Sequence, residues 1–199
     1  MSRHSAFLMG CCALAALAAT STAQASGSAA AGLQDLRALN LIVLGNMSGG
    51  HDVEGKTFVG GNLTNAATYG LGRSSEGFAV STFPTLTVVG SLSGNANINN
   101  GPNGSIANGV VPAGATVGGS VGSINLNANN ATLLVGGSIG GTNGGNGATI
   151  KAGGRLGSNP HPTGTLVQGN LGSAFTTPLV SGLNAEKATL TADLTSLST

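Results

Sequence analysis

Val-Gly-Gly-Ser-Val at 117–121 and Val-Gly-Gly-Ser-Ile at 135–139 are two copies of one short phrase in this chain. Related phrases stand at 43–47, 59–63, 88–92, 152–156 and 167–171. A strand-sized unit that recurs along a chain is typical of a solenoid, in which each turn of backbone stacks on the previous turn. The repeated phrase therefore predicts an all-β solenoid.

The phrases align on a shared glycine, at Gly45, Gly61, Gly90, Gly119, Gly137, Gly154 and Gly169. The residues two before and two after this glycine are apolar in every copy. On an extended chain these positions point to one face, so stacked turns would form continuous apolar ladders in the interior. Two intervals between successive glycines, from Gly61 to Gly90 and from Gly90 to Gly119, are longer than the others. Each holds either one turn with a loop or nearly two turns.

The residue after the shared glycine is polar throughout: Asn46, Asn62, Ser91, Ser120, Ser138, Arg155 and Asn170. Small polar residues beside glycine are typical of tight corners, where Asn and Gly tolerate left-handed backbone angles. We therefore expect the phrase to build the solenoid. A functional surface is expected between the phrases, in the two long intervals, on the 52–56 face, or along outer Thr and Asn columns.

Composition agrees with a packed scaffold. The 199 residues include 35 Gly, yet the glycines follow no three-residue period and only 6 residues are Pro, which excludes collagen. Disordered chains are rich in charge and poor in aliphatic residues. Here 40% of the residues are hydrophobic, 7% are charged, and the mean hydropathy is +0.25.

The N-terminus has the pattern of a secretory signal peptide over residues 1–25. Arg3 precedes an apolar stretch, and Ala23-Gln24-Ala25 provides a cleavage site after Ala25. An uncleaved anchor and lipidation at Cys11 are the alternatives. Both cysteines, Cys11 and Cys12, lie inside this segment, so the mature chain would have no disulfide and no thiolate chemistry. Its basic and acidic residues would balance, which offers no electrostatic footprint for nucleic acid or an anionic membrane. No second long apolar run follows.

A single domain is predicted over residues 26–199, with a helix at its C-terminal end. The leucines Leu179, Leu183, Leu190, Leu194 and Leu197 recur on one helical face. Thr177 as N-cap and Pro178 at the first helical position place this helix at about 178–199, packed against the solenoid or capping it. A short helix is expected at 31–40.

The only charge cluster is His51–Lys56. If this segment is a strand, Asp52, Glu54 and Lys56 share one face, and paired carboxylates can serve acid/base catalysis or hold a hard cation. A polysaccharide-active β-helix enzyme using Asp52 and Glu54 is therefore one alternative. The aligned residues of the neighbouring turns are Gly, Ser, Asn and Ala, which favours a solvated or structural face.

Three further patterns are weaker candidates for function. Residues 140–150 resemble a calcium-binding nonapeptide repeat but lack its Asp, so a solenoid corner is preferred. His161 lies between two prolines and is expected to be an exposed loop residue. A regular threonine array could order water, which makes ice binding a second alternative; the candidate threonines are Thr85, Thr87, Thr116, Thr132 and Thr149.

The stretch Leu39–Met47, followed by Asp52–Asn62, resembles the opening of the choice-of-anchor A domain. The resemblance implies a secreted bacterial surface domain, adhesin-like, with a right-handed parallel β-helix. It supplies no catalytic residue, metal or cofactor. The residues that match the family signature, and that we expect to be structural, are Asp52, Val53, Glu54, Gly55, Gly60, Gly61 and Asn62. The sequence ends at Thr199 without a sorting signal, so the mode of surface attachment stays open.

Together these observations predict a secreted, non-enzymatic, adhesin-like structural or binding module at the cell surface or in the extracellular space. The expected partners are extracellular carbohydrate or a matrix or cell-surface protein, reached through a flat face of small polar groups. Nucleic acid is not an expected partner, and no integral membrane span is expected in the mature chain.

Overall fold

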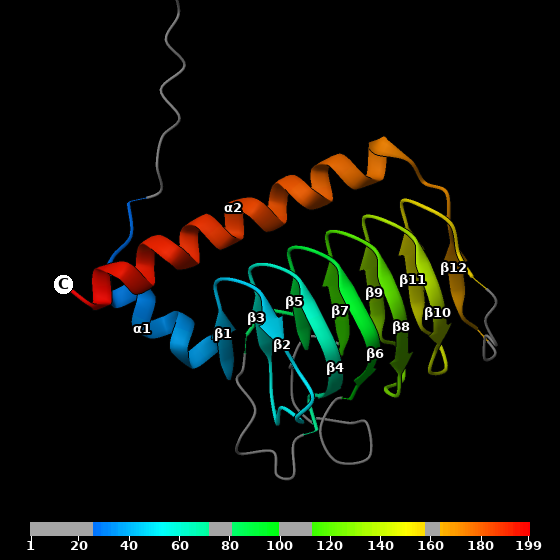
Figure 1. The fold of residues 1–199 in the computed structure, drawn as a ribbon, viewed down its shortest axis with the longest axis horizontal. Helices are drawn as coiled ribbons and strands as arrows, with labels where there is room; N and C mark the ends of the chain where they lie inside the picture. The colour runs from blue at the N-terminus through cyan, green and yellow to red at the C-terminus, as the bar shows by residue number, and fades with distance from the viewer. Residues whose placement is uncertain (1–25, 72–80, 100–112, 158–163) are drawn as a thin grey trace, which may run out of the picture.

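The computed structural model describes residues 26–71, 81–99, 113–157 and 164–199. In these parts the strands form two parallel sheets, accompanied by two helices (Figure 1). The seven-stranded sheet, called sheet A, contains β1 (Leu41–Val43), β3 (Thr57–Val59), β5 (Leu86–Val88), β7 (Gly114–Val117), β9 (Thr132–Val135), β11 (Thr149–Ala152) and β12 (Leu166–Gln168). The five-stranded sheet, called sheet B, contains β2 (Met47–Ser48), β4 (Leu63–Tyr69), β6 (Leu92–Ile98), β8 (Val121–Leu126) and β10 (Ile139–Asn143).

From β1 to β10 the chain alternates between the two sheets, so one strand of sheet A and the next strand of sheet B make one coil. Each strand pairs in parallel with the equivalent strand of the neighbouring coil, which is a β-helix-like arrangement. β5 pairs with both β3 and β7. Each long interval between phrases therefore contributes one coil. The additional residues of these two intervals include 72–80 and 100–112, which lie outside the described residues.

The apolar columns predicted from the phrase form the core. In sheet A, Val59, Val88, Val117 and Val135 stack in register and are fully buried. In sheet B, the inward column is Leu63, Leu92, Val121 and Ile139. Side chains stacked in this way keep their apolar surface from water along the whole length of the molecule, which is the main driving force for folding.

The predicted register is wrong in the last copy of the phrase. Val167 pairs with Ile150, two residues away from the Ala152 expected from the glycine alignment. Beyond β12 the chain turns away through Asn170 and Gly172, which have φ values of 53° and 67°. Sheet A ends at β12, so no further strand holds this phrase in the register of the others.

The polar column at the corner forms a ladder of side-chain hydrogen bonds, which we call the corner ladder. Each side-chain oxygen accepts the backbone N–H of the equivalent residue in the next coil. The pairs are Asn46 with Asn62 (2.7 Å), Asn62 with Ser91 (2.9 Å), Ser91 with Ser120 (3.1 Å), Ser120 with Ser138 (3.1 Å) and Ser138 with Arg155 (3.0 Å). The ladder supplies acceptors where the chain leaves the sheet and its backbone donors would otherwise lack partners.

The shared glycine is explained by this ladder and not by a left-handed backbone. The left-handed angle expected among the polar residues after the glycine occurs in one described copy, at Asn170. None of the shared glycines in the described parts has a positive φ. A Cβ on the glycine would instead collide with the side-chain oxygen of the coil before, at Gly61, Gly90, Gly119, Gly137 and Gly154. Gly45 belongs to the first coil and has nothing within 4 Å of the same point.

Helix α1 (Ala29–Ala38) lies close to the predicted short helix, and Ser28 caps it by accepting the Ala31 N–H at 3.1 Å. Helix α2 (Ser173–Leu197) begins five residues earlier than predicted. Its N-cap is Gly172, and Pro178 lies inside the helix. The turn after β12 sets this start, because the Gly172 carbonyl already accepts the Thr176 N–H at 3.0 Å.

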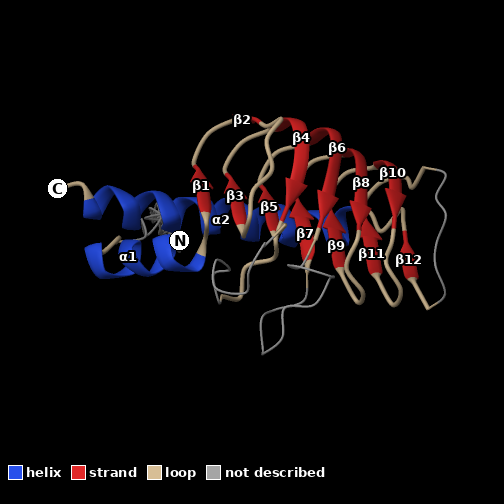
Figure 2. Ribbon diagram, turned by 90° about the horizontal axis from the view of Figure 1, so that it is seen from below, coloured by secondary structure: helices blue, strands red, loops and turns tan. Residues whose placement is uncertain are grey.

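Helix α2 packs against the coils and does not cap their end. It runs from the β12 end back past β1 and lies beside α1 (Figures 1 and 2). Thr176 Oγ1 donates to the carbonyl of Gly136 at 2.7 Å, and Leu183 would meet a Cβ placed on Gly118. Leu190 is 2% exposed and clusters with Leu39 and Phe58. The helix therefore lies along one corner of the coils, where small residues allow its close approach.

Replacing Gly137 by Ala should lower the free energy of unfolding by about 1–3 kcal/mol, because the new Cβ overlaps Ser120 Oγ and lies 2.9 Å from Ser120 N. Gly45→Ala is the matched control in the same column and should be neutral or slightly stabilising, by up to about 1 kcal/mol. Urea denaturation followed by circular dichroism measures both. Equal loss of stability in the two variants would contradict the role given to the corner ladder.

Candidate functional site

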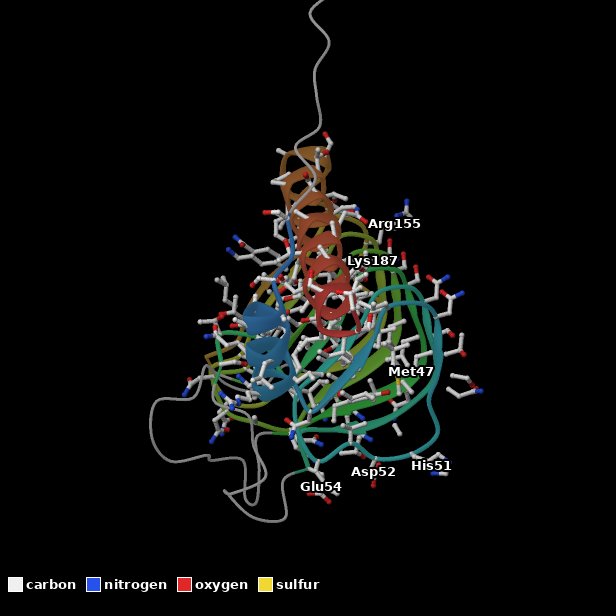
Figure 3. All side chains as sticks on the ribbon, turned by 90° about the vertical axis from the view of Figure 1, so that its left-hand side faces the viewer. Met47, His51, Asp52, Glu54, Arg155 and Lys187 are labelled. Carbon is white, nitrogen blue, oxygen red and sulfur yellow. The ribbon has the colours of Figure 1, made fainter. Side chains whose placement is uncertain are left out.

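The charge cluster lies in the turn between β2 and β3. His51, Asp52 and Glu54 are exposed and project away from the coils (Figure 3). Asp52 Oδ1 accepts the Thr68 N–H at 3.1 Å, and the Val53 N–H donates to the Thr68 carbonyl at 2.8 Å. These contacts fasten the turn to β4.

Lys56 does not share a face with the two carboxylates, so that expectation is wrong. Its side chain is 1% exposed, and Nζ donates to the carbonyl and the hydroxyl of Ser81 at 2.5 and 3.2 Å. Burial lowers the pKa of the Lys56 ammonium. The prediction assumed strand alternation, but residues 51–56 form a turn with a single bridge at Val53, and alternation fails there.

The remaining signature residues contact the backbone or side chains of the coil before them. A Cβ on Gly55 would overlap the Asn40 side chain, and a Cβ on Gly60 would overlap the Leu44 carbonyl. Gly61 and Asn62 belong to the corner ladder.

In the described parts of the chain, no group of three or more His, Cys, Asp or Glu could hold a metal ion. Residues 140–150, which resemble a calcium-binding repeat, form most of β10, a turn with Gly147 at φ 71°, and the start of β11. His161 lies outside the described residues.

The threonines do not form one exposed array. Thr85 and Thr87 are only 2% and 1% exposed, and Thr85 Oγ1 donates to the Asn99 carbonyl at 3.4 Å. Thr132 pairs with Thr149 on sheet A, and both are half-buried. Thr87 pairs with Thr116, which then pairs with Leu134. The threonine column is therefore interrupted within two coils.

The outer side of sheet B presents a different surface, which we call the polar face. Neither helix crosses it (Figures 1 and 2). Its outward residues are exposed or half-buried and none is charged: Ser48, Thr64, Asn65, Ala67, Thr68, Ser93, Gly94, Asn95, Asn97, Gly122, Ser123, Asn125, Gly140, Gly141 and Asn143. A sheet surface that is uncharged, lined by small side chains and not covered by either helix is a candidate contact surface.

Two short ladders of asparagine side chains join neighbouring coils at the polar face, one on its strands and one just beyond their ends. Asn97, Asn125 and Asn143 pair in register on β6, β8 and β10. The Asn125 amide donates to Asn97 Oδ1 at 2.9 Å, and just beyond these strands the Asn127 amide donates to Asn99 Oδ1 at 2.8 Å. The residues between them, Ile98 and Leu126, are buried in the core, so the amides stand on a packed support.

The sequence predicted outer Asn columns as one possible functional surface but did not identify the asparagines that form them. The signal was present as two Asn-x-Asn pairs, at 97–99 and 125–127, but the coil between them includes residues 100–112. Only the observed pairing of β6 with β8 brings the two pairs together.

A family model described as "Putative Ice-binding-like adhesive domain" matches residues 32–199. The chain belongs to this family. The match supports the adhesive kind of domain that the sequence resemblance implied, but it does not specify the choice-of-anchor A family. No curated protein and no solved structure matches the adhesive domain. In the parts of the chain that the structure describes, no helix is both long and apolar enough to cross a membrane.

Two carboxylates of the adhesive domain lie at the contact between its helices. Asp193 on α2 is 6% exposed, and its Oδ1 accepts the Ser28 N–H at 2.8 Å. Burial, and secondarily the charge of Asp193, raises the pKa of Asp35 on α1. The folded state therefore holds the Asp35 proton more tightly than the unfolded chain does.

Replacing Asp35 by Asn should stabilise the domain at pH 7, because it removes a charge that folding brings into a partly buried site beside Asp193. The raised pKa means that this penalty shrinks as the pH falls through the folded pKa, and it is absent below the ordinary value of 3.8. Denaturant titrations of both proteins at pH 7 and pH 3 measure the difference. An advantage of the variant that is unchanged at pH 3 would rule out this explanation.

Proposed function

We propose that the chain is a secreted, non-enzymatic, adhesin-like module that attaches to an extracellular surface through the polar face of sheet B. One observation carries the proposal: a chain of an adhesive-domain family presents a sheet of uncharged, small polar side chains that neither helix covers. We further propose that the coils form a complete right-handed solenoid, as expected for a choice-of-anchor A domain.

The physical basis of attachment would be many weak contacts on a rigid support. A single neutral hydrogen bond contributes about 0.5–1.5 kcal/mol net, so one residue cannot hold a surface. The polar face repeats its groups from coil to coil, and its backbone is already ordered by the parallel ladders. Little conformational entropy is then lost on binding, which favours affinity from small groups.

Secretion follows from the predicted signal peptide at 1–25. The absence of enzymatic activity is also part of the proposal. Asp52 and Glu54 lie on an exposed turn, and Asp52 Oδ1 is engaged by the Thr68 N–H. The purified chain should not depolymerise neutral or acidic polysaccharides, and turnover that disappears in Asp52→Asn would establish the enzymatic alternative instead.

Ice binding is the second candidate function, favoured by the family description and by the lack of charge on the polar face. The relevant surface would be sheet B, since Thr87 on sheet A and Thr85, which directly precedes β5, are buried. Thermal hysteresis and ice-crystal shaping by the purified chain test this candidate, and their absence would remove it.

Asn95→Glu should reduce attachment of chain-coated beads to the surfaces that the wild-type chain binds. Asn95 is exposed on β6, and a carboxylate placed there must lose hydration against any neutral surface. Thr189→Glu on the exposed side of α2 is the matched control and should leave attachment unchanged. Equal attachment by both variants, with both folded, would show that the polar face is not the contact surface.

A further inference from the structure

We propose that the two asparagine ladders bind the hydroxyl groups of a neutral polysaccharide that lies along the coils. The inference rests on the proposed function and names its ligand class. The ladders are the pair Asn97–Asn125, continued by Asn143, and the pair Asn99–Asn127.

The ladders form a regular grid. Neighbouring amides of the ladder through Asn97, Asn125 and Asn143 belong to hydrogen-bonded parallel strands, about 4.8 Å apart. The second ladder, Asn99 with Asn127, lies two residues further along the chain, just beyond the ends of β6 and β8. β4 and β6 pair with register shifts, whereas β6 and β8 stay in register from Asn95 to Ile98 on β6, and β8 and β10 from Ser123 to Asn125 on β8. The asparagines therefore occupy the part of the polar face where equivalent groups recur from coil to coil.

The amides keep most of their hydrogen-bonding capacity. A primary amide has two donor hydrogens and two acceptor lone pairs, and a ladder bond uses one of each per pair. Asn125 donates to Asn97 and Asn127 donates to Asn99, and these side chains have no other hydrogen-bond partner within the described residues. Each position thus presents a donor beside an acceptor, which matches a hydroxyl group, since a hydroxyl also donates and accepts.

The absence of charge on the polar face favours a neutral ligand over a charged one. No outward residue of the polar face carries a charge. A sulfate or carboxylate on the ligand would lose hydration against the amides without gaining a countercharge, which is costly.

A protein partner fits the polar face less well. Protein interfaces depend on a few large anchors, enriched in Trp, Tyr and Arg, that fill pockets on the partner. The outward residues of the polar face include none of these types, and Tyr69 at the end of β4 is buried in the core. A polymer of hydroxyl-bearing units, which repeats the same small contact many times, suits a grid of amides better.

The experiment measures binding of the full chain to two matched pairs of polymers: hydroxyethyl cellulose with carboxymethyl cellulose, and dextran with dextran sulfate. We expect at least one neutral member to bind at least tenfold more tightly than its charged counterpart. The double variant Asn125→Ala with Asn127→Ala should lower that affinity at least tenfold. Asn129→Ala, in the exposed turn after β8, is the matched control and should bind like wild type.

Asn143→Ala supplies a second variant in case the double variant does not fold. Asn143 is exposed, and no hydrogen bond of its side chain holds the domain together within the described residues, so its loss should reduce affinity without a change in thermal midpoint. Full affinity in the folded double variant or in Asn143→Ala would overturn the inference, and so would preference for the charged polymers or ice shaping without polymer binding. If Asn95→Glu still abolishes attachment in that case, the proposed function survives and only the ligand class fails.

Discussion

The structure depends on one repeated interaction, the hydrogen bond from the backbone N–H of one corner residue to the side-chain oxygen of the same column in the coil before. It joins Asn46, Asn62, Ser91, Ser120, Ser138 and Arg155 in sequence along the molecule. The side-chain oxygen occupies the space where the shared glycine would carry a Cβ. The Gly-Asn or Gly-Ser pair is thus one device, in which the glycine makes room and the polar side chain satisfies the next coil.

The same corner determines which surface remains available. Gly118, Gly136 and Gly153 precede the shared glycine, and α2 packs along them through residues such as Thr176 and Leu183. The long helix therefore lies along the corner between the sheets, beside α1 at one end (Figure 2). Sheet B is left with its outer face free of both helices, and its apolar side chains are directed into the core.

Much of the fold could be predicted because the phrase repeats. The valine column of sheet A and the leucine column of sheet B follow from the spacing around the glycine, and the predicted pairing fails in the last phrase, which begins with Val167 in the last strand of the sheet and runs beyond its end. Segments that occur only once were harder to predict. Pro178 indicated a helix start, but the helix begins earlier because the turn at Gly172 sets its first residue. Lys56 was expected to follow strand alternation, but its segment is a turn, where alternation does not apply. The asparagine ladders join residues 28 apart, so the two Asn-x-Asn pairs are visible in the sequence but their pairing is not.

If attachment occurs through the polar face, a bulky group placed on that face should prevent it. The two cysteines of the chain, Cys11 and Cys12, lie in the predicted signal peptide, so a cysteine placed at Ser123 can carry a bulky polyethylene glycol as the only modified site of the mature protein. A cysteine placed at Thr189, which is exposed on α2, provides the comparison. Bead attachment should be lost when position 123 is modified and retained when position 189 is modified. Attachment that survives modification at 123, or that is lost only at 189, would show that the polar face is not the contact surface.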